Sequence, residues 1–298
     1  MKTLFEQLIA HGPVVTDGAW GTQLQARGLP IGACPDAWNL SHPEYVAEVA
    51  EAYVGAGSQV ILTNTFGANR LSLARYDLAG RAEEINRLGA GISRRAANGR
   101  AHVFASIGPT GKMLAMGEAS PEELRAAFLE QAFALEAGGA DALVIETMSD
   151  LEEAKIALDA AQQTGLPVVV CMVFGAGKEA DRTIMGVTPE QAAEELTDAG
   201  ADAIGTNCGN GPAQMLALCR RLRAATPLPL WVKPNAGLPE IVDGRAVYTM
   251  LPEAFAPQAA ALVHAGAAFV GGCCGTAPDF IRALQEALGK ETADYERP

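Results

Sequence analysis

The chain of 298 residues has 22 Lys and Arg against 35 Asp and Glu, a net charge of −13, and 49% of its residues are apolar. This balance is typical of a globular α/β protein with a sizeable core, and the negative charge argues against a nucleic-acid partner. The longest apolar run, 167–174, is too short to cross a membrane, so we expect no membrane association.

The N-terminal residues predict an amphipathic helix. Glu6 falls where a signal peptide would have its apolar stretch, which argues against an export signal. The six cysteines show no spacing typical of a small disulfide-stabilised domain. We therefore expect a cytoplasmic protein whose thiols are free or bound to metal.

Short apolar strands alternate with amphipathic helices along the whole chain. The expected strands are 13–17, 59–65, 102–107, 141–146, 167–174, 202–207, 229–234 and 268–273. The expected helices are 43–56, 78–98, 121–138, 150–164, 189–199, 212–225, 253–265 and 278–288. Ser120 and Thr188, each followed by proline, are start signals for two of these helices.

Eight β–α units of this total length predict a single α/β domain, a (β/α)8 TIM barrel over residues 1–290. The near-continuous apolar strands are typical of a parallel sheet that is covered on both faces. A doubly wound parallel sheet is the alternative. Residues 291–298 are expected to form a polar C-terminal tail.

Polar and sulfur-bearing side chains stand at the carboxyl ends of the expected strands, where barrel enzymes have their active sites. They are Asp17, Asn64, Thr65, Glu146, Asn207, Cys208, Lys233, Asn235, Cys273 and Cys274. Because all carboxyl ends share one face of a barrel, Cys208 is expected to meet Cys273 and Cys274 despite 273 − 208 = 65 residues of separation.

Three converging thiolates suit zinc, which prefers sulfur and nitrogen ligands. None of the four histidines is expected at the carboxyl end of a strand. A site with three cysteine ligands and no fourth protein ligand is typical of a catalytic zinc.

Other interpretations of the cysteines stay open. Adjacent Cys273 and Cys274 also fit a vicinal disulfide or two small buried side chains, although Cys208 at a matching strand end favours the metal. The remaining cysteines are expected elsewhere, Cys171 and Cys219 in the core and Cys34 in a surface loop.

The ionisable residues have alternatives too. Asp17 and Glu146 fit helix caps or loop acids as well as a binding site. Lys233 fits a Schiff-base lysine at the end of a barrel strand, or a solvated loop residue.

A zinc ion with three thiolate ligands is a weak acid towards water but a good holder of another thiolate. A thiol bound there loses its proton at neutral pH and keeps a nucleophilic sulfur. The expected site therefore indicates alkyl transfer to sulfur.

Seven motifs in order along the chain resemble the homocysteine S-methyltransferase family. They are D-G-A-W-G-T (17–22), L-T-N-T-F-G-A-N (62–69), I-G-P-T-G (107–111), I-E-T-M-S-D (145–150), N-C-G-N-G-P (207–212), K-P-N-A-G-L-P (233–239) and G-G-C-C-G-T (271–276). The resemblance runs from about residue 10 to residue 289. C-P-D-A-W-N-L-S-H-P (34–43) and P-N-A-G-L-P are more similar to the homocysteine-binding module of cobalamin-dependent methionine synthases than to betaine–homocysteine methyltransferase.

The resemblance implies a zinc-dependent S-methyltransferase that converts L-homocysteine to methionine. It implies one zinc per chain, bound by Cys208, Cys273 and Cys274. It also implies that Asp17 and Glu146 hold the ammonium group of the amino acid. Gly18 and Thr65 match positions near the bound homocysteine, and Asn207 and Asn235 match positions beside the metal.

The methyl donor stays open. The resemblance favours a methyl-corrinoid on a separate protein or domain, because methionine synthases carry folate, cobalamin and activation domains after this module. S-methylmethionine, S-adenosylmethionine and betaine are alternative donors, and a related thiol or selenol is an alternative acceptor. The sequence has no cobalamin or nicotinamide motif. A Schiff-base lyase and a non-catalytic zinc-stabilised barrel are the rival functions.

Overall fold

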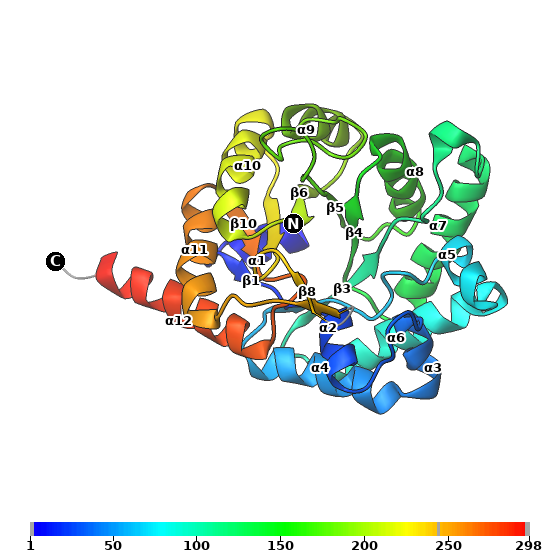
Figure 1. Cartoon of the computed structure of the whole chain (residues 1–298), viewed down its shortest axis with the longest axis horizontal. Coiled ribbons are helices and arrows are strands. Elements are labelled where there is room, and N and C mark those ends of the chain that lie inside the picture. The colour runs from blue at the N-terminus through cyan, green and yellow to red at the C-terminus, as the bar shows by residue number, and fades with distance from the viewer. Residues whose placement is uncertain (1–2, 243–244, 296–298) are drawn as a thin grey trace.

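The computed structural model describes residues 3–242 and 245–295, and parallel strands form a ring at its centre, inside a layer of helices (Figure 1). The strands of the ring are β1 (Val14–Val15), β2 (Val60–Ile61), β3 (His102–Ile107), β4 (Ala142–Met148), β5 (Val168–Met172), β6 (Ala203–Cys208), β7 (Leu230–Pro234) and β10 (Ala267–Val270). They pair in the order β1-β10-β7-β6-β5-β4-β3-β2, and a parallel bridge between Thr16 and Val60 joins the two ends. The predicted (β/α)8 barrel is therefore confirmed, and the doubly wound alternative is wrong.

Eight helices follow the strands, and except at the end of the last one their bounds lie within a few residues of the expected ranges. They are α4 (Pro43–Gly55), α6 (Ala82–Ala97), α7 (Pro121–Ala137), α8 (Leu151–Gln162), α9 (Pro189–Asp198), α10 (Pro212–Ala225), α11 (Pro252–His264) and α12 (Pro278–Tyr295). The start signals act as expected: Ser120 and Glu123 form a capping box at α7, and the Thr188 hydroxyl accepts from the Gln191 amide at α9.

The last helix is longer than its sequence pattern suggested. Residues 291–295, expected to begin a polar tail, continue α12 as helical backbone. Residues 296–298 of that expected tail lie outside the described residues. In the described part of the chain, no helix is both long enough and apolar enough to cross a membrane.

Several short elements lie outside the regular alternation. The helix α1 (Leu4–Ile9) was expected from the N-terminal pattern, whereas α2 (Gly21–Ala26), α3 (Trp38–Ser41), α5 (Arg70–Leu73) and the short 3-10 helices η1 (Pro35–Ala37), η2 (Ala74–Tyr76), η3 (Ala79–Arg81) and η4 (Leu114–Met116) were not. An antiparallel hairpin of β8 (Glu240–Val242) and β9 (Arg245–Val247) was also unexpected and is drawn over the ring in Figure 1. These elements are shorter than the windows in which hydrophobic periodicity can be detected.

Aromatic side chains fill the inside of the barrel. Phe104, Trp231 and Phe269 contact one another from three strands, with ring centroids 5.3–6.3 Å apart. Phe5 of α1 packs on Phe104 and Phe269 at 5.5 Å each. Because apolar side chains pack the interior, polar chemistry is left to the loops at the carboxyl ends of the strands.

The structure corrects the expected environment of Cys34. This residue is only 7% exposed and packs with Leu73 and Ile85, whereas a surface loop had been expected. Its segment folds back as η1 over α6, and its thiol lies 3.7 Å from a carboxylate oxygen of buried Asp36. Cys171 in the barrel interior and Cys219 in α10 are core residues, as expected.

Candidate active site

Three cysteine side chains meet at the carboxyl end of the barrel. Cys208 is the last residue of β6, and Cys273 and Cys274 follow β10. Their Sγ atoms all lie within 4.8 Å of one another, and all three residues are partly buried. Among the described residues this is the one group of three or more His, Cys, Asp and Glu side chains close enough to share a metal ion. The convergence expected from strand order is thus present.

The backbone around the thiols is held in unusual conformations and by cross-strand hydrogen bonds. Cys208 has a φ of +64° and Gly209 a φ of +65°, so the chain turns through the left-handed region at the end of β6. This region is unfavourable for a residue other than glycine, and such strain is common at functional sites. The Cys273 amide donates to the Pro234 carbonyl at 2.7 Å, which fixes the thiol loop after β10 to the end of β7.

The loops after the first and last strands are also locked together. The Gly272 amide donates to the Asp17 carbonyl at 3.0 Å. The Thr276 hydroxyl donates to the Cys273 carbonyl at 2.7 Å and accepts from the Ala19 amide at 3.1 Å. A Cβ atom on Gly272 would lie 2.4 Å from the Thr276 hydroxyl oxygen, so the contact requires glycine there.

Two asparagine amides contact the sulfur atoms. Asn235 Nδ2 lies 3.7 Å from Cys208 Sγ and donates to the Gly209 carbonyl at 2.6 Å. Asn207 Nδ2 lies 3.9 Å from Cys273 Sγ. N–H groups directed at sulfur stabilise its thiolate form. Asn235 Oδ1 is buried without a hydrogen-bond partner, which leaves one acceptor free beside the thiols.

Contacts among the three thiols shift their pKa values in opposite directions. Hydrogen bonds from Cys273 and Cys274 lower the pKa of Cys208 well below its ordinary value, with a smaller contribution from Asn235. The same contacts with Cys208 raise the pKa of Cys273 and Cys274. Three soft sulfur donors, one of them readily deprotonated, with N–H donors around them, fit the requirements of a zinc ion.

Glu146 in β4 is the acid next to the thiols. It is 7% exposed, and its carboxylate accepts from the Ser106 hydroxyl at 2.5 Å and from Asn207 Nδ2 at 3.3 Å. Burial raises the pKa of Glu146 above its ordinary value, although the positive charge of Lys233 and the Ser106 hydrogen bond oppose the shift. Asn207 therefore links this acid to the Cys273 sulfur.

Asp17 is fully buried and engaged by protein groups. Its Oδ1 atom lies 2.5 Å from Lys233 Nζ, and its Oδ2 atom accepts from the Trp20 indole and the Leu62 amide, both at 2.7 Å. Lys233, which had been considered for a solvated loop, is in β7 and only 2% exposed. Burial disfavours its charge, but Asp17 and Glu146 outweigh that effect and raise the pKa of Lys233.

The two remaining predicted residues take supporting positions. A Cβ atom on Gly18 would lie 2.7 Å from both the Thr276 and the Tyr53 hydroxyl oxygens, so the β1 loop approaches its neighbours closely there. Thr65 is fully buried, and its hydroxyl donates to the Ser106 carbonyl at 2.7 Å. Thr65 thus supports the residue that donates to Glu146.

Sequence reasoning missed several residues that build this site. Ser106, Trp20 and Thr276 supply hydrogen bonds to Glu146, Asp17 and the thiol loop, respectively. Trp20 and Thr276 lie inside the quoted motifs, and Ser106 directly precedes the I-G-P-T-G motif, so the motifs were the available signal.

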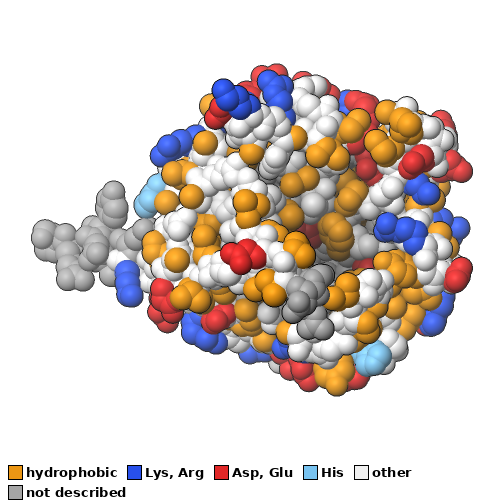
Figure 2. Space-filling view, viewed as in Figure 1, with side chains coloured by type: hydrophobic (Ala, Val, Ile, Leu, Met, Phe, Trp, Pro, Cys, Tyr) orange, Lys and Arg blue, Asp and Glu red, His pale blue; other side chains and the backbone are white. Residues whose placement is uncertain are grey.

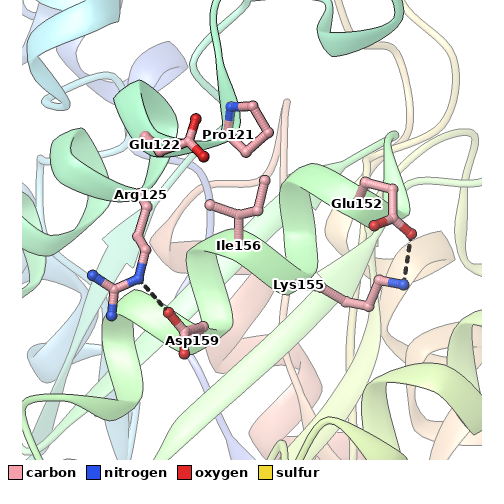
Figure 3. A pocket seen from close by; sticks show the side chains of 7 residues that line it. All are labelled: Pro121, Glu122, Arg125, Glu152, Lys155, Ile156 and Asp159. Atoms are coloured by element: carbon pink, nitrogen blue, oxygen red, sulfur yellow. Dashed lines mark hydrogen bonds and ion pairs between the residues drawn. The ribbon is translucent and has the colours of Figure 1, made fainter.

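Two concavities lie outside the group of three thiols. Figure 3 shows one between α7 and α8, where Arg125 pairs with Asp159 and Lys155 pairs with Glu152, both at 2.6 Å. Both cations of that concavity are already paired. A second concavity, lined by 236–238, 249–251 and Ala254, begins next to the thiols, because the Ala236 amide donates to the Cys274 carbonyl.

Exposed apolar side chains gather in the segments that follow the barrel strands, and we call this set the apolar rim. The most exposed members are Ile31, Met116, Ile184, Leu238, Ile241 and Leu251, each at least 62% exposed. Figure 2 shows hydrophobic side chains around a hollow on the face seen in that view. Of the exposed large hydrophobic residues in the described ranges, Phe133 on α7 is the one outside these segments.

Comparison with known proteins gives concordant results. A sequence profile described as homocysteine S-methyltransferase matches residues 14–288. Methionine synthases of Mycobacterium leprae (strain TN) and Mycobacterium tuberculosis (strain ATCC 25618 / H37Rv) are 33% identical to the chain, over 95% and 98% of its length. The chain spans 25% of the length of these two relatives.

Two solved structures of one enzyme are similar to the chain in fold. The metallated form of the homocysteine methyltransferase MmuM from Escherichia coli matches with a TM-score of 0.76 at 25% identity, over 92% of this chain and 96% of that chain. The oxidized form of the same enzyme matches with a TM-score of 0.79 at 24% identity, over 95% and 99%.

Proposed function

Because the chain belongs to the homocysteine S-methyltransferase family, we propose that it transfers a methyl group to the thiol of L-homocysteine and releases methionine. The observation that carries the proposal is the group of three thiols, within 4.8 Å of one another, at the end of the barrel where such enzymes have their active sites. A buried acid, Glu146, lies on the same face.

The three thiols are the proposed ligands of one Zn²⁺ per chain. Cys208, Cys273 and Cys274 supply three protein ligands, the number typical of a catalytic zinc site. When bound, the zinc would supply Lewis acidity that lowers the pKa of the acceptor thiol. The metallated form of the MmuM relative supports this assignment.

The surrounding residues would bind and orient the acceptor. Asn207 and Asn235 hold the sulfur ligands through their amide groups. Glu146 would receive the acceptor's ammonium, since its buried carboxylate carries no ion pair among the described residues. Gly18 and Thr65 would keep the adjoining loops in place.

For the methyl donor we favour a methyl-corrinoid carried by a separate protein or domain. A protein donor would have to cover the barrel mouth, and the apolar rim offers a surface suited to such contact. The methionine synthases that resemble the chain are about four times its length, which leaves room in them for further domains. S-methylmethionine, S-adenosylmethionine and betaine are the alternative donors.

The Schiff-base alternative conflicts with the state of Lys233. A Schiff base requires a neutral, accessible amine. Lys233 is 2% exposed, pairs with Asp17, and has a raised pKa, so its amine is protonated and enclosed. Since a protonated amine has no lone pair to attack a carbonyl, we propose the transferase over the lyase. The dependence on reduced thiols favours a reducing compartment such as the cytoplasm.

Incubation with separate donors tests this proposal. Zinc-loaded protein and homocysteine are mixed with methylcobalamin, S-methylmethionine, S-adenosylmethionine or betaine, and methionine is quantified. We expect product with methylcobalamin, no product from Cys273→Ala at any homocysteine concentration, and normal product from Cys219→Ala, whose thiol lies in α10. Product with betaine alone would refute the corrinoid assignment, and turnover by Cys273→Ala would refute the thiol site itself.

A further inference from the structure

Lys233 places a buried positive charge in contact with Asp17. Its Nζ atom contacts Asp17 Oδ1, and its charge also acts on Glu146. Lys233 and Asp17 are 2% and 0% exposed, so solvent does not screen this pair. The two partners lie 216 residues apart in the sequence.

The contacts of the two acids are unequal. Both oxygens of Asp17 are engaged, Oδ1 by Lys233 and Oδ2 by the Trp20 indole and the Leu62 amide. Glu146 accepts only from neutral groups, Ser106 and Asn207, and its contact with Asn207 is long at 3.3 Å. Of the about four acceptor positions of a carboxylate, Asp17 uses three and Glu146 two. Glu146 therefore has more acceptor capacity left, and it has no cation in hydrogen-bond contact among the described residues.

The charges of these three residues leave one negative charge without a partner. Two carboxylates and one ammonium sum to −1, and Asp17 is the carboxylate that Lys233 contacts. An uncompensated charge in a buried site is unfavourable, so a ligand that brings one positive charge would be stabilised there.

We propose that Lys233 is a positioning residue that sets the charge selectivity of the acceptor pocket: it neutralises Asp17 and leaves Glu146 as the single carboxylate that binds the acceptor's ammonium. This inference rests on the proposed function. The family resemblance implied a different arrangement, in which Asp17 and Glu146 both bind the ammonium.

Three acceptors separate the two arrangements. L-homocysteine carries an ammonium and a carboxylate, 4-sulfanylbutanoate lacks the ammonium, and 3-sulfanylpropylamine lacks the carboxylate. The dissociation constant of each from zinc-loaded protein is measured by calorimetry, without a methyl donor. Since a hydrogen bond to a charged group contributes roughly 1.5–3 kcal/mol, wild type should bind homocysteine about 10- to 150-fold tighter than 4-sulfanylbutanoate.

The decisive variant is the neutral pair Asp17→Asn with Lys233→Met. It removes both charges of the ion pair and keeps the net −1 on Glu146. We expect the homocysteine to 4-sulfanylbutanoate ratio to stay within about threefold of wild type, a difference of less than 1 kcal/mol. Glu146→Gln should bring the ratio close to one. If the neutral pair no longer preferred homocysteine to 4-sulfanylbutanoate, the inference would be overturned, because Asp17 would then bind the ammonium.

The single variant Lys233→Met gives a second, opposite signature. Asp17 would be left as an unpaired carboxylate, so we expect tighter binding of 3-sulfanylpropylamine than in wild type and a lower melting temperature. Unchanged or weaker binding of this amine by a folded variant would count against the inference. If the single variant does not fold, the neutral pair still decides.

The outcomes also separate this inference from the proposed function. Binding of homocysteine by wild type tests the function, and its absence would overturn both. Binding of homocysteine with the ratio lost in the neutral pair would overturn the role of Lys233 alone.

Discussion

Asn207 and Glu146 share a hydrogen bond in which Asn207 Nδ2 lies 3.3 Å from Glu146 Oε2. The same nitrogen lies 3.9 Å from Cys273 Sγ, and the Asn207 side chain is fixed on both sides by Thr147. One amide therefore sets the separation between the acid proposed for the ammonium and a sulfur proposed as a zinc ligand. Under the proposed function, that separation would have to match the distance between the ammonium and the thiol of homocysteine.

Replacement of Asn207 by alanine should weaken both homocysteine binding and zinc binding. Loss of a buried hydrogen bond costs about 1–3 kcal/mol, so we expect the homocysteine KM of Asn207→Ala to rise about 5- to 150-fold. The affinity for zinc should fall in the same variant, because the N–H donor beside Cys273 is lost. Steady-state kinetics and competition with a chelator measure the two effects. Gln163→Ala, an exposed change after α8, serves as control, and equal behaviour of both variants would contradict the role of Asn207.

Replacement of Glu146 by glutamine should act on acceptor binding. The ammonium lies at the end of the acceptor remote from the sulfur, so KM should rise about 10- to 150-fold with little change in kcat. A fall in kcat at constant KM would assign Glu146 to the chemical step instead. Glu152→Gln, an exposed change at the start of α8, is the matched control.

The pH dependence of KM should carry the signature of the same residue. Burial raises the pKa of Glu146, and only the ionised carboxylate attracts an ammonium. Homocysteine affinity should therefore weaken as pH falls through this raised pKa, at a pH above the usual range for glutamate. Glu146→Gln should not show this weakening of affinity at low pH. If the variant still shows it, another group is responsible.

Gly272→Ala should disturb the thiol loop without touching a sulfur. The added Cβ would lie 2.4 Å from the Thr276 hydroxyl oxygen, so that side chain or the loop must shift. We expect at least about tenfold weaker zinc binding, the usual effect of losing a supporting contact around a metal site. Gly55→Ala at the end of α4 is the control, since its added Cβ meets nothing within 4 Å. Similar zinc affinity in the two variants would show that the loop accommodates the added methyl group without moving the thiols.

The stability at acid pH should report an ion pair at the opposite end of the barrel. Partial burial disfavours the charge of Asp141, but hydrogen bonds from His102 and Arg94 outweigh it and hold the pKa of Asp141 at about 2. A depressed pKa stabilises the fold above the unfolded value near 3.9, and this contribution is lost as pH falls towards 2. The difference in unfolding free energy between wild type and Asp141→Asn, measured by urea titration, should be largest near pH 6 and shrink below pH 4. A constant difference would contradict the assigned pKa.

The proximity of the three cysteines could be predicted from the sequence, because hydrophobic periodicity locates the strands at whose ends they stand. Short apolar strands alternate with helices, parallel strands of a barrel end on one face, and the cysteines stand at two of those ends. The state of Lys233 could not be predicted in this way. Its partner Asp17 is 216 residues away, and nothing within either local segment indicates that the two side chains meet.

The same limit applies to Cys34 and to the hairpin. Cys34 is buried because its loop folds back onto α6, a contact set by the tertiary structure. The hairpin β8–β9 has three residues in each strand, and all three β8 residues are exposed. A strand exposed on both faces has no alternation of apolar and polar residues to reveal it.

The pairing of β1 with β10, in which Val14 faces Phe269, has a consequence for the order of events during synthesis. Cys273 and Cys274 are translated long after β1, and they directly follow β10, the strand that fills the gap beside β1. At typical ribosomal speeds of 5–20 residues per second, the edge of β1 waits roughly 10–50 s for its neighbour. An unpaired strand edge can aggregate during that interval. Protection of that edge by chaperones during translation should therefore raise the yield of folded protein.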